Sequence, residues 1–269
     1  MKLTNKVVVV TGAASGIGRA LCERFHREGT LAIVAADLNV EAAQSVAHAV
    51  GGLAVACDVA SERNIVHLVE ETEQRLGPID LFCSNAGIAV IDADPSNIAN
   101  TPDEIWQRSW AVNVMAHIYA ARVLLPRMIA RGGGYFLHTI SAAGLLSQIG
   151  SAIYSTTKHA AVGFAENLAI MHRREGIRVS ILCPQGVDTA MLRAMPPGPQ
   201  SLDGVLTPEE VADCVVSGLE QEHFLILPHP QVATYLQRKI ENYDRFIGGM
   251  AKLKTTLARG AEPTGGRGC

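Results

Sequence analysis

The stretch Val7-Val8-Val9-Val10-Thr11-Gly12-Ala13-Ala14-Ser15-Gly16-Ile17-Gly18 decides the fold of this chain. Its valine run is typical of a short β-strand, and the glycines that follow permit a tight turn into a helix. At such a turn, backbone N–H groups and the helix dipole favour a phosphate group. The order of strand, glycine loop and helix therefore predicts a dinucleotide-binding site. The residues expected to contact the cofactor there are Gly12, Ser15, Gly16, Ile17 and Gly18.

The spacing of these glycines, Gly-x-x-x-Gly-x-Gly, differs from the Gly-x-Gly-x-x-Gly of the standard dinucleotide fingerprint. A glycine-rich turn between a strand and a helix can also serve packing alone. Because this loop directly follows the first predicted strand, we favour the cofactor site.

Short apolar runs alternate with helical patterns over the first 230 residues. The predicted strands are Val7–Thr11, Ala32–Ala36, Ala54–Cys57, Leu81–Ser84, Tyr135–Ile140, Arg178–Cys183 and Phe224–Leu227. The predicted helices are Gly16–Glu28, Val40–Ala49, Glu62–Leu76, Pro102–Arg131, Ser151–Glu175 and Pro208–Leu219. This alternation predicts an α/β fold: a single-domain, Rossmann-type, doubly wound parallel sheet of about seven strands with helices on both faces.

Three segments depart from the alternation within the expected single domain, 1–257. A proline-rich stretch, which Pro and Gly keep irregular, predicts a lid near 189–206. Apolar residues at helical spacing predict a C-terminal amphipathic extension over 230–257. The last residues, 258–269, are rich in glycine and arginine and are expected to be disordered.

Composition excludes several classes of protein. The 269 residues carry a net charge of −3 with scattered Lys and Arg, which argues against nucleic acid as a partner. The six cysteines show no C-x-x-C spacing, and the histidines form no ligand pattern, so we expect neither disulfides nor a metal site. No run is long enough for a signal peptide or a membrane span. We expect a cytoplasmic protein that acts on a small molecule.

Asp37 ends the second predicted strand, nineteen residues after Gly18. An acid at this place accepts hydrogen bonds from the adenosine ribose and repels a 2′-phosphate. Ser15 and Leu38 are uncharged, so neither would neutralise that phosphate, and we expect NAD as the cofactor. The alternative is that Asp37 only caps the helix beginning near Val40.

Tyr154 and Lys158 are spaced Tyr-x-x-x-Lys, which places both on one face of a helix. A neighbouring ammonium favours the ionised phenol, so we expect Lys158 to lower the pKa of Tyr154. Tyr154 would then give and take protons at neutral pH. Such a pair also occurs by chance in many helices.

These motifs together resemble the short-chain dehydrogenase/reductase family over about residues 5–230. Besides the glycine loop and the Tyr154–Lys158 pair, Ser84-Asn85-Ala86-Gly87 is similar to its Asn-Asn-Ala-Gly motif, with Ser84 in place of the first Asn. The resemblance implies further cofactor contacts for Tyr154 and Lys158 themselves and for Leu38, Asp58, Val59, Asn85, Ala86, Gly87, Val187 and Thr189.

The resemblance also implies hydride transfer between the nicotinamide and a carbonyl or alcohol carbon. Tyr154 would be the general acid or base, and Lys158 would also hold the nicotinamide ribose. Ser141 would donate to the substrate oxygen, and Asn113 would hold a water that links Lys158 to solvent. The alternatives are that Ser141 caps the next turn and that Asn113 pins a helix kink. Gln185 replaces the glycine that the family usually has there, and we expect it to contact the substrate.

The expected pocket wall is mostly apolar and rich in methionine, which favours a moderately hydrophobic secondary alcohol or ketone. The family's helix pairing implies a homodimer or homotetramer. Two other functions stay open: a redox sensor that binds NAD without turnover, and a reductase of acyl thioesters. The intact set of Asn113, Ser141, Tyr154 and Lys158 argues against the sensor, and Asp37 argues against the thioester reductase because such enzymes typically prefer NADPH.

Overall fold

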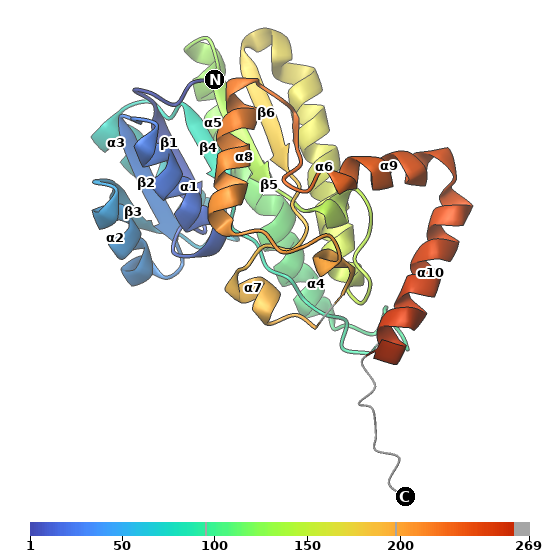
Figure 1. Ribbon diagram of the computed structural model, residues 1–269. Helices are drawn as coiled ribbons and strands as arrows, with labels where there is room; N and C mark the ends of the chain where they lie inside the picture. Colours follow the sequence, from blue (N-terminus) through green and yellow to red (C-terminus); the bar gives the residue numbers. More distant parts are fainter. Residues whose placement is uncertain (95, 197, 261–269) are drawn as a thin grey trace, which may run out of the picture.

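The computed structural model describes residues 1–94, 96–196 and 198–260, with side chains up to 257 (Figure 1). Its centre is a parallel sheet of seven strands in the order β3-β2-β1-β4-β5-β6-β7. The strands are β1 (Val7–Thr11), β2 (Ala32–Asp37), β3 (Leu53–Ala56), β4 (Leu81–Ser84), β5 (Gly134–Thr139), β6 (Ile177–Leu182) and β7 (Leu225–Ile226). The predicted doubly wound sheet is confirmed.

Helices cover both faces of this sheet (Figure 1). One face packs against α1 (Gly16–Arg27), α2 (Val40–Ala49) and α8 (Pro208–Glu220). The other packs against α3 (Glu62–Leu76), α5 (Ala116–Ala130) and α6 (Ala152–His172). The remaining helices longer than one turn are α4 (Asp103–Trp110), α7 (Ala190–Arg193), α9 (Gln231–Glu241) and α10 (Tyr243–Gly260).

The valine run of β1 is explained by this layering. Val7 and Val9 lie in the core beneath α3, α5 and α6, whereas Val8 and Val10 lie in the core beneath α1, α2 and α8. Successive side chains of a strand point to opposite faces, so a strand covered on both faces needs apolar residues throughout. β1 also stands between β2 and β4, where the strand order reverses, and ligands bind at that point in such sheets.

The predicted helix Pro102–Arg131 is interrupted. α4 ends at Trp110, one π-helical turn spans Ala111–Met115, and α5 begins at Ala116. A π turn widens the helix and often marks a functional site.

Two more predictions need correction. The 189–206 segment, expected to be irregular, contains α7 and a 3₁₀ turn at Pro199–Ser201. The C-terminal extension is two helices, because the backbone of Asn242 is extended and separates α9 from α10. α10 continues to Gly260, so the first three residues of the expected disordered tail are helical; the rest, 261–269, lies outside the described residues. Within the described chain, no helix is both long and apolar enough to cross a membrane.

Two histidines meet in the core between β5 and α5. His117 and His138 are both about 1% exposed, and their Nδ1 atoms lie 3.0 Å apart. Burial lowers the pKa of His138 to about 3 and holds that of His117 well below its usual range. Both rings are therefore neutral, and one donates its Nδ1–H to the other.

This pair predicts an acid-sensitive core. Below about pH 6.5, the two imidazoles bind protons in the unfolded chain but stay neutral in the folded protein. The free energy of unfolding therefore falls as the pH drops from 6.5 toward 3. The double variant His117→Leu/His138→Leu should lose much of this dependence, measured by urea unfolding at pH 7.5 and pH 5. The exposed variant His48→Gln is the control. Equal pH dependence in the double variant and the wild type would contradict the assignment.

Candidate active site

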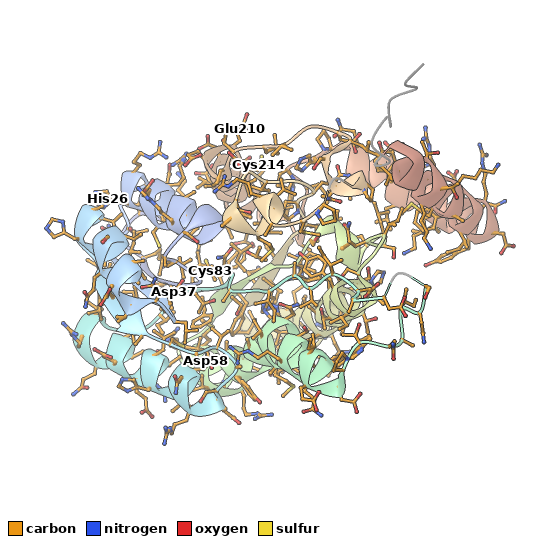
Figure 2. All side chains as sticks on the ribbon, turned by 90° about the horizontal axis from the view of Figure 1, so that it is seen from below. His26, Asp37, Asp58, Cys83, Glu210 and Cys214 are labelled. Atoms are coloured by element: carbon orange, nitrogen blue, oxygen red, sulfur yellow. The ribbon has the colours of Figure 1, made fainter. Side chains whose placement is uncertain are left out.

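A cavity of about 1090 Å³ opens at the carboxyl ends of the strands. It is lined by the glycine loop, the ends of β2 to β6, the 189–206 segment and the C-terminal helices. Figure 2 labels Asp37, the last residue of β2, and Asp58, which comes shortly after the neighbouring strand β3. Every sequence-predicted site residue except Asn113 lines this one cavity.

The glycine loop approaches the end of β4 too closely for any side chain. A Cβ on Gly12, whose φ is +66°, would lie 2.8 Å from the Cα of Ala86. A Cβ on Gly18 would lie 2.1 Å from the carbonyl oxygen of Gly12. Contacts this short do not occur, so both positions require glycine and leave the start of α1 open to a ligand.

Asn85 fastens the loop to β4. Its Nδ2 donates to the carbonyl oxygens of Thr11 at 3.0 Å and Gly12 at 3.4 Å. The Thr11 hydroxyl accepts in return from the backbone N–H groups of Asn85 and Ala86, at 3.0 and 3.2 Å. Asn85 thus shapes the glycine loop from the neighbouring strand.

Asp37, the last residue of β2, is hydrogen-bonded to the same loop. Its carboxylate accepts from the N–H of Ala14 at 3.0 Å and from the N–H of Asn39 at 2.9 Å. The cap of α2 is Asn39, whose side chain accepts from the N–H of Ala42, so the alternative that Asp37 caps this helix is wrong. Asp37 lines the cavity, with the strongly exposed Leu38 beside it.

Asp58 pairs with a cation that the sequence analysis missed. Arg108 of α4 lies 3.3 Å from its carboxylate and also lines the cavity. The pair connects residues 50 positions apart, and no local pattern signals such a contact.

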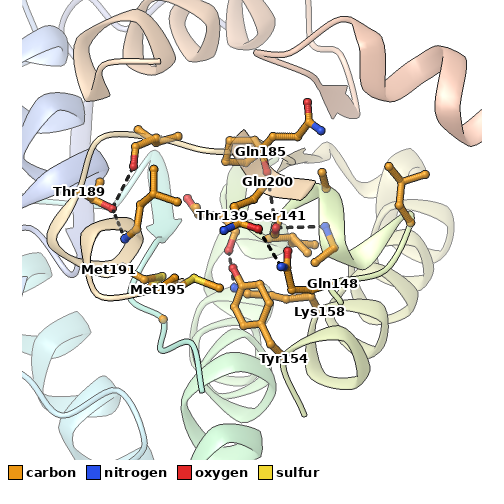
Figure 3. Close-up of a pocket in the computed structure, with 18 of the residues that line it drawn as sticks. Thr139, Ser141, Gln148, Tyr154, Lys158, Gln185, Thr189, Met191, Met195 and Gln200 are labelled. Carbon is orange, nitrogen blue, oxygen red and sulfur yellow. Dashed lines mark hydrogen bonds between the residues drawn. The ribbon is translucent and has the colours of Figure 1, made fainter. Parts of the chain in front are cut away.

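Ser141, Tyr154 and Lys158 converge at the end of β5, beside Met191 and Met195 of the 189–206 segment (Figure 3). The Ser141 Oγ accepts from the N–H of Ala143 at 3.1 Å, so this serine does cap the next turn, as one alternative held. It also forms a hydrogen bond with Tyr154 that favours the ionised phenol. The Ser141 hydroxyl therefore caps this turn and also faces the cavity.

Burial raises the pKa of Tyr154 above its ordinary value, and the Ser141 hydrogen bond offsets only part of that rise. The expectation that Lys158 lowers this pKa is therefore not met. The Lys158 Nζ lies 5.5 Å from the centroid of the Tyr154 ring and donates to the Thr139 carbonyl at 3.2 Å. Burial also lowers the pKa of Lys158 to about 8, which weakens its influence as a charge.

Asn113, within the π turn, holds the chain after β4. Its Nδ2 donates to the Ile88 carbonyl and its Oδ1 accepts from the Ile88 N–H, both at 2.9 Å. Nδ2 also donates to the Thr157 hydroxyl at 3.2 Å, one residue before Lys158. The Asn113 side chain thus joins the π turn to the chain after β4 and to α6. Gly87 adjoins both groups, since a Cβ there would lie 3.4 Å from Asn113 Oδ1 and Lys158 Nζ.

The two ends of the 189–206 segment are held together by backbone contacts. Val187 and Leu206 form an isolated parallel bridge, with the Asp188 N–H donating to the Leu206 carbonyl at 2.8 Å. Thr189 caps α7, and its methyl group would lie 3.0 Å from a Cβ on Gly16. The start of this segment therefore lies against the glycine loop, and its two ends are hydrogen-bonded to each other.

Gln185 lines the cavity, and its buried Oε1 has no hydrogen-bond partner among the described residues. Its backbone N–H donates to Nδ1 of His229 at 3.1 Å. His229, after β7, is 2% exposed, and burial lowers its pKa, so the neutral ring is available as an acceptor. Sequence reasoning missed His229 because its target lies 44 positions away.

The five cysteines in the described part of the chain are free thiols. Cys22, Cys57, Cys83 and Cys183 are buried free thiols, and Cys214 is half-buried. Cys269 lies outside the described residues. Residues 1–94, 96–196 and 198–257 contain no cluster of three potential metal ligands.

Comparison with known proteins identifies the family. The family model described as short chain dehydrogenase matches residues 6–199. The chain belongs to the short-chain dehydrogenase family. It is 33% identical to 1-deoxy-11-beta-hydroxypentalenate dehydrogenase of Streptomyces exfoliatus, over 92% of this chain and 91% of the relative. It is 30% identical to human epidermal retinol dehydrogenase 2, over 95% and 81% of the two chains.

A solved structure supports the same assignment. A short-chain dehydrogenase/reductase from Burkholderia phymatum in complex with NAD superposes on this short-chain dehydrogenase with a TM-score of 0.80 and 27% identity. The match covers 90% of this chain and 96% of the other. The protein is therefore an oxidoreductase of this family with a Rossmann-like fold, as the sequence predicted.

The contacts of Asn113 predict a structural role. Asn113→Ala removes three hydrogen bonds and leaves the Ile88 backbone groups unpaired, which should lower the free energy of unfolding by roughly 2–4 kcal/mol. Urea unfolding followed by circular dichroism measures this loss. The exposed variant Asn97→Ala should change it by less than about 0.5 kcal/mol. A stable Asn113→Ala protein would contradict the interpretation.

Proposed function

We propose that this short-chain dehydrogenase transfers a hydride between NAD and a moderately hydrophobic secondary alcohol or ketone, with Tyr154 as general acid or base. The observation that carries the proposal is the convergence of Ser141, Tyr154 and Lys158 on the cavity that the glycine loop also lines.

The residues present fit a dinucleotide. The glycine loop leaves the N-terminus of α1 free of side chains, and the cavity of about 1090 Å³ has room for a cofactor and a substrate together. Such a cofactor, when bound, supplies the nicotinamide carbon that gives or takes the hydride. Gly12 to Gly18 would hold its phosphates and Lys158 its nicotinamide ribose. Asp58 and Val59 would contact the adenine, and Val187 with Thr189 the carboxamide.

Asp37 supports NAD over NADP. Its carboxylate is already oriented by the N–H groups of Ala14 and Asn39, so it is fixed where a ribose hydroxyl would meet it. Arg108 lines the same cavity but is paired with Asp58, which leaves it less suited to neutralise a 2′-phosphate.

Tyr154 is suited to donate a proton to a carbonyl oxygen. Because burial raises its pKa, the phenol stays protonated at neutral pH, and Ser141 beside it can donate a second hydrogen bond to the same oxygen. In the direction of oxidation, the ionised phenol of Tyr154 would receive the alcohol proton, while Ser141 would donate a hydrogen bond to the substrate oxygen. Asn113 holds Ile88 and Thr157 in place around Lys158.

The substrate part of the cavity is largely apolar. Leu146 lies on one wall, Met191, Met195 and Leu202 on a second, and Phe246 on a third, which supports a hydrophobic substrate. Gln185, with its unpartnered Oε1, is proposed as a polar substrate contact. Both reported relatives are named as dehydrogenases of a hydroxyl-bearing compound, in keeping with an alcohol.

The expected homodimer or homotetramer is also part of the proposal. Trp110 at the end of α4 is 41% exposed, and Ile170 and Met171 at the end of α6 are 75% and 64% exposed. Exposed apolar side chains on these helices are in keeping with a contact between copies.

Replacing Tyr154 tests the chemistry. Tyr154→Phe removes the proton donor, so kcat/KM for secondary alcohols with NAD should fall about 10²- to 10⁴-fold. The affinity for NADH, measured by its fluorescence, should change little. Tyr119→Phe, which alters a phenol outside the cavity, is the control. Full activity of Tyr154→Phe, or NAD binding by the wild type without turnover of any alcohol or ketone, would refute the proposed function.

Replacing Asp37 tests the cofactor preference. Asp37→Ser removes the charge that repels a 2′-phosphate, and the ratio of kcat/KM for NAD to that for NADP should fall about tenfold or more. Glu41→Ser removes an exposed charge in the first turn of α2 and should leave the ratio unchanged. A wild type that prefers NADP, or an unchanged ratio in Asp37→Ser, would contradict this assignment.

A further inference from the structure

The C-terminal helix pair, α9 and α10, forms the far wall of the cavity. In Figure 1, α9 leaves the layered body past α6, and α10 runs back toward the end of the molecule that carries α4 and α7. Phe246, Met250 and Leu253 of α10 line the cavity at helical spacing. With a rise of 1.5 Å per residue, these three side chains follow the wall for about 10 Å.

Lys239 of α9 holds this helix pair to the body. Its Nζ donates to the carbonyl oxygens of Leu145 at 2.7 Å and Leu146 at 3.0 Å. The same atom lies 5.4 Å from the ring centroid of Tyr243 and 5.5 Å from that of Phe246, both on α10. Lys239 is 6% exposed and has no carboxylate partner within the described residues. One buried cation therefore joins α9, α10 and the loop after Ser141.

Two other hydrogen bonds complete a ring of contacts around the cavity. The Tyr235 hydroxyl of α9 donates to Asp203 of the 189–206 segment at 2.8 Å. Gln148 of the loop after Ser141 donates to Gln200 of that segment at 2.9 Å. The three walls of the cavity are the C-terminal helix pair, the 189–206 segment and the loop after Ser141. Each is thus hydrogen-bonded to the other two.

The reacting end of the cavity does not depend on these ties. The Ala142 N–H donates to the Pro184 carbonyl at 2.8 Å, and the loop packs there on α6, where a Cβ on Gly144 would lie 2.7 Å from the Lys158 carbonyl. Ser141 is therefore fixed by β6 and α6, whereas Leu145 and Leu146 lie farther along and meet Lys239. Loosening Lys239 should change the far wall and spare the chemistry.

We propose that Lys239 is a positioning residue that fixes the C-terminal helix pair as the far wall of the substrate pocket and so adapts the enzyme to alcohols with an extended apolar body. The inference rests on the proposed function and names its substrate class: secondary alcohols whose hydrocarbon part reaches about 10 Å along α10. Short alcohols would bind at the reacting end alone and gain nothing from this wall.

The test compares short and long substrates in one variant. Lys239→Met keeps most of the side-chain volume but removes the cation, and it is assayed with NAD on 2-butanol and 2-decanol. We expect kcat/KM for 2-decanol to fall about tenfold, chiefly through KM, and that for 2-butanol to stay within about threefold. Gln237→Ala, an exposed change on the same helix, should alter neither value. An equal loss for both alcohols, or no loss for either, would overturn the proposal.

Hydrogen exchange separates this inference from the proposed function. In Lys239→Met, backbone amides of 243–257 should exchange faster than in the wild type, and unchanged protection would overturn the positioning role. A wild type that turns over no alcohol or ketone would refute the proposed function, while the exchange result would still decide whether Lys239 holds the helix pair. If Lys239→Met does not fold, Tyr235→Phe removes the Asp203 bond without leaving a buried charge unpaired. It should show the same selective loss for 2-decanol, and an equal effect on both alcohols would overturn the proposal.

Discussion

The Lys158 ammonium is 3% exposed and pairs with no carboxylate in the described part of the chain, and the groups around it are arranged to tolerate that charge. A cation removed from water is costly unless polar groups replace the lost solvent. Here the Thr139 carbonyl and the ring of Tyr154 do so, and burial still lowers the pKa of the lysine to about 8. The neighbouring His117 and Cys183 stay neutral, because burial lowers the pKa of the imidazole and raises that of the thiol to about 12.

The same physical solution occurs a second time, at Lys239. Both ammonium groups donate to backbone carbonyls and lie over aromatic rings, at distances between 5.4 and 5.5 Å from the ring centroids. In both places, the cation joins elements that are distant in sequence: α6 to β5 in the first, and the C-terminal helices to the loop after Ser141 in the second. The first lies at the proposed reacting end of the cavity, and the second lies at its far wall.

The sequence predicted the features that arise from local patterns. The seven strands could be placed because a strand buried on both faces needs an unbroken apolar run, as in Val7–Thr11. The glycine loop could be recognised because Gly12 and Gly18 have no room for a Cβ. The direction of the Tyr154 pKa could not be predicted, because the spacing to Lys158 shows that the two are neighbours but not how deeply each is buried. Arg108, His229 and the break at Asn242 were missed for a similar reason, since each depends on contacts or backbone geometry that no short motif encodes.

Lys239 illustrates why such contacts escape sequence reasoning altogether. Its partners, Leu145 and Leu146, act through their carbonyl oxygens, and every residue type offers the same acceptor. No side-chain pattern in the loop after Ser141 therefore predicts the contact. Because the acceptors are backbone carbonyls, the contact does not depend on which side chains the loop carries. The residues proposed for the chemistry, in contrast, would act through specific side chains at set spacings, and a motif records those spacings. The chemistry proposed for this short-chain dehydrogenase is for that reason visible in its sequence, whereas the shape of the cavity becomes visible only when the C-terminal helices are placed against the body of the fold.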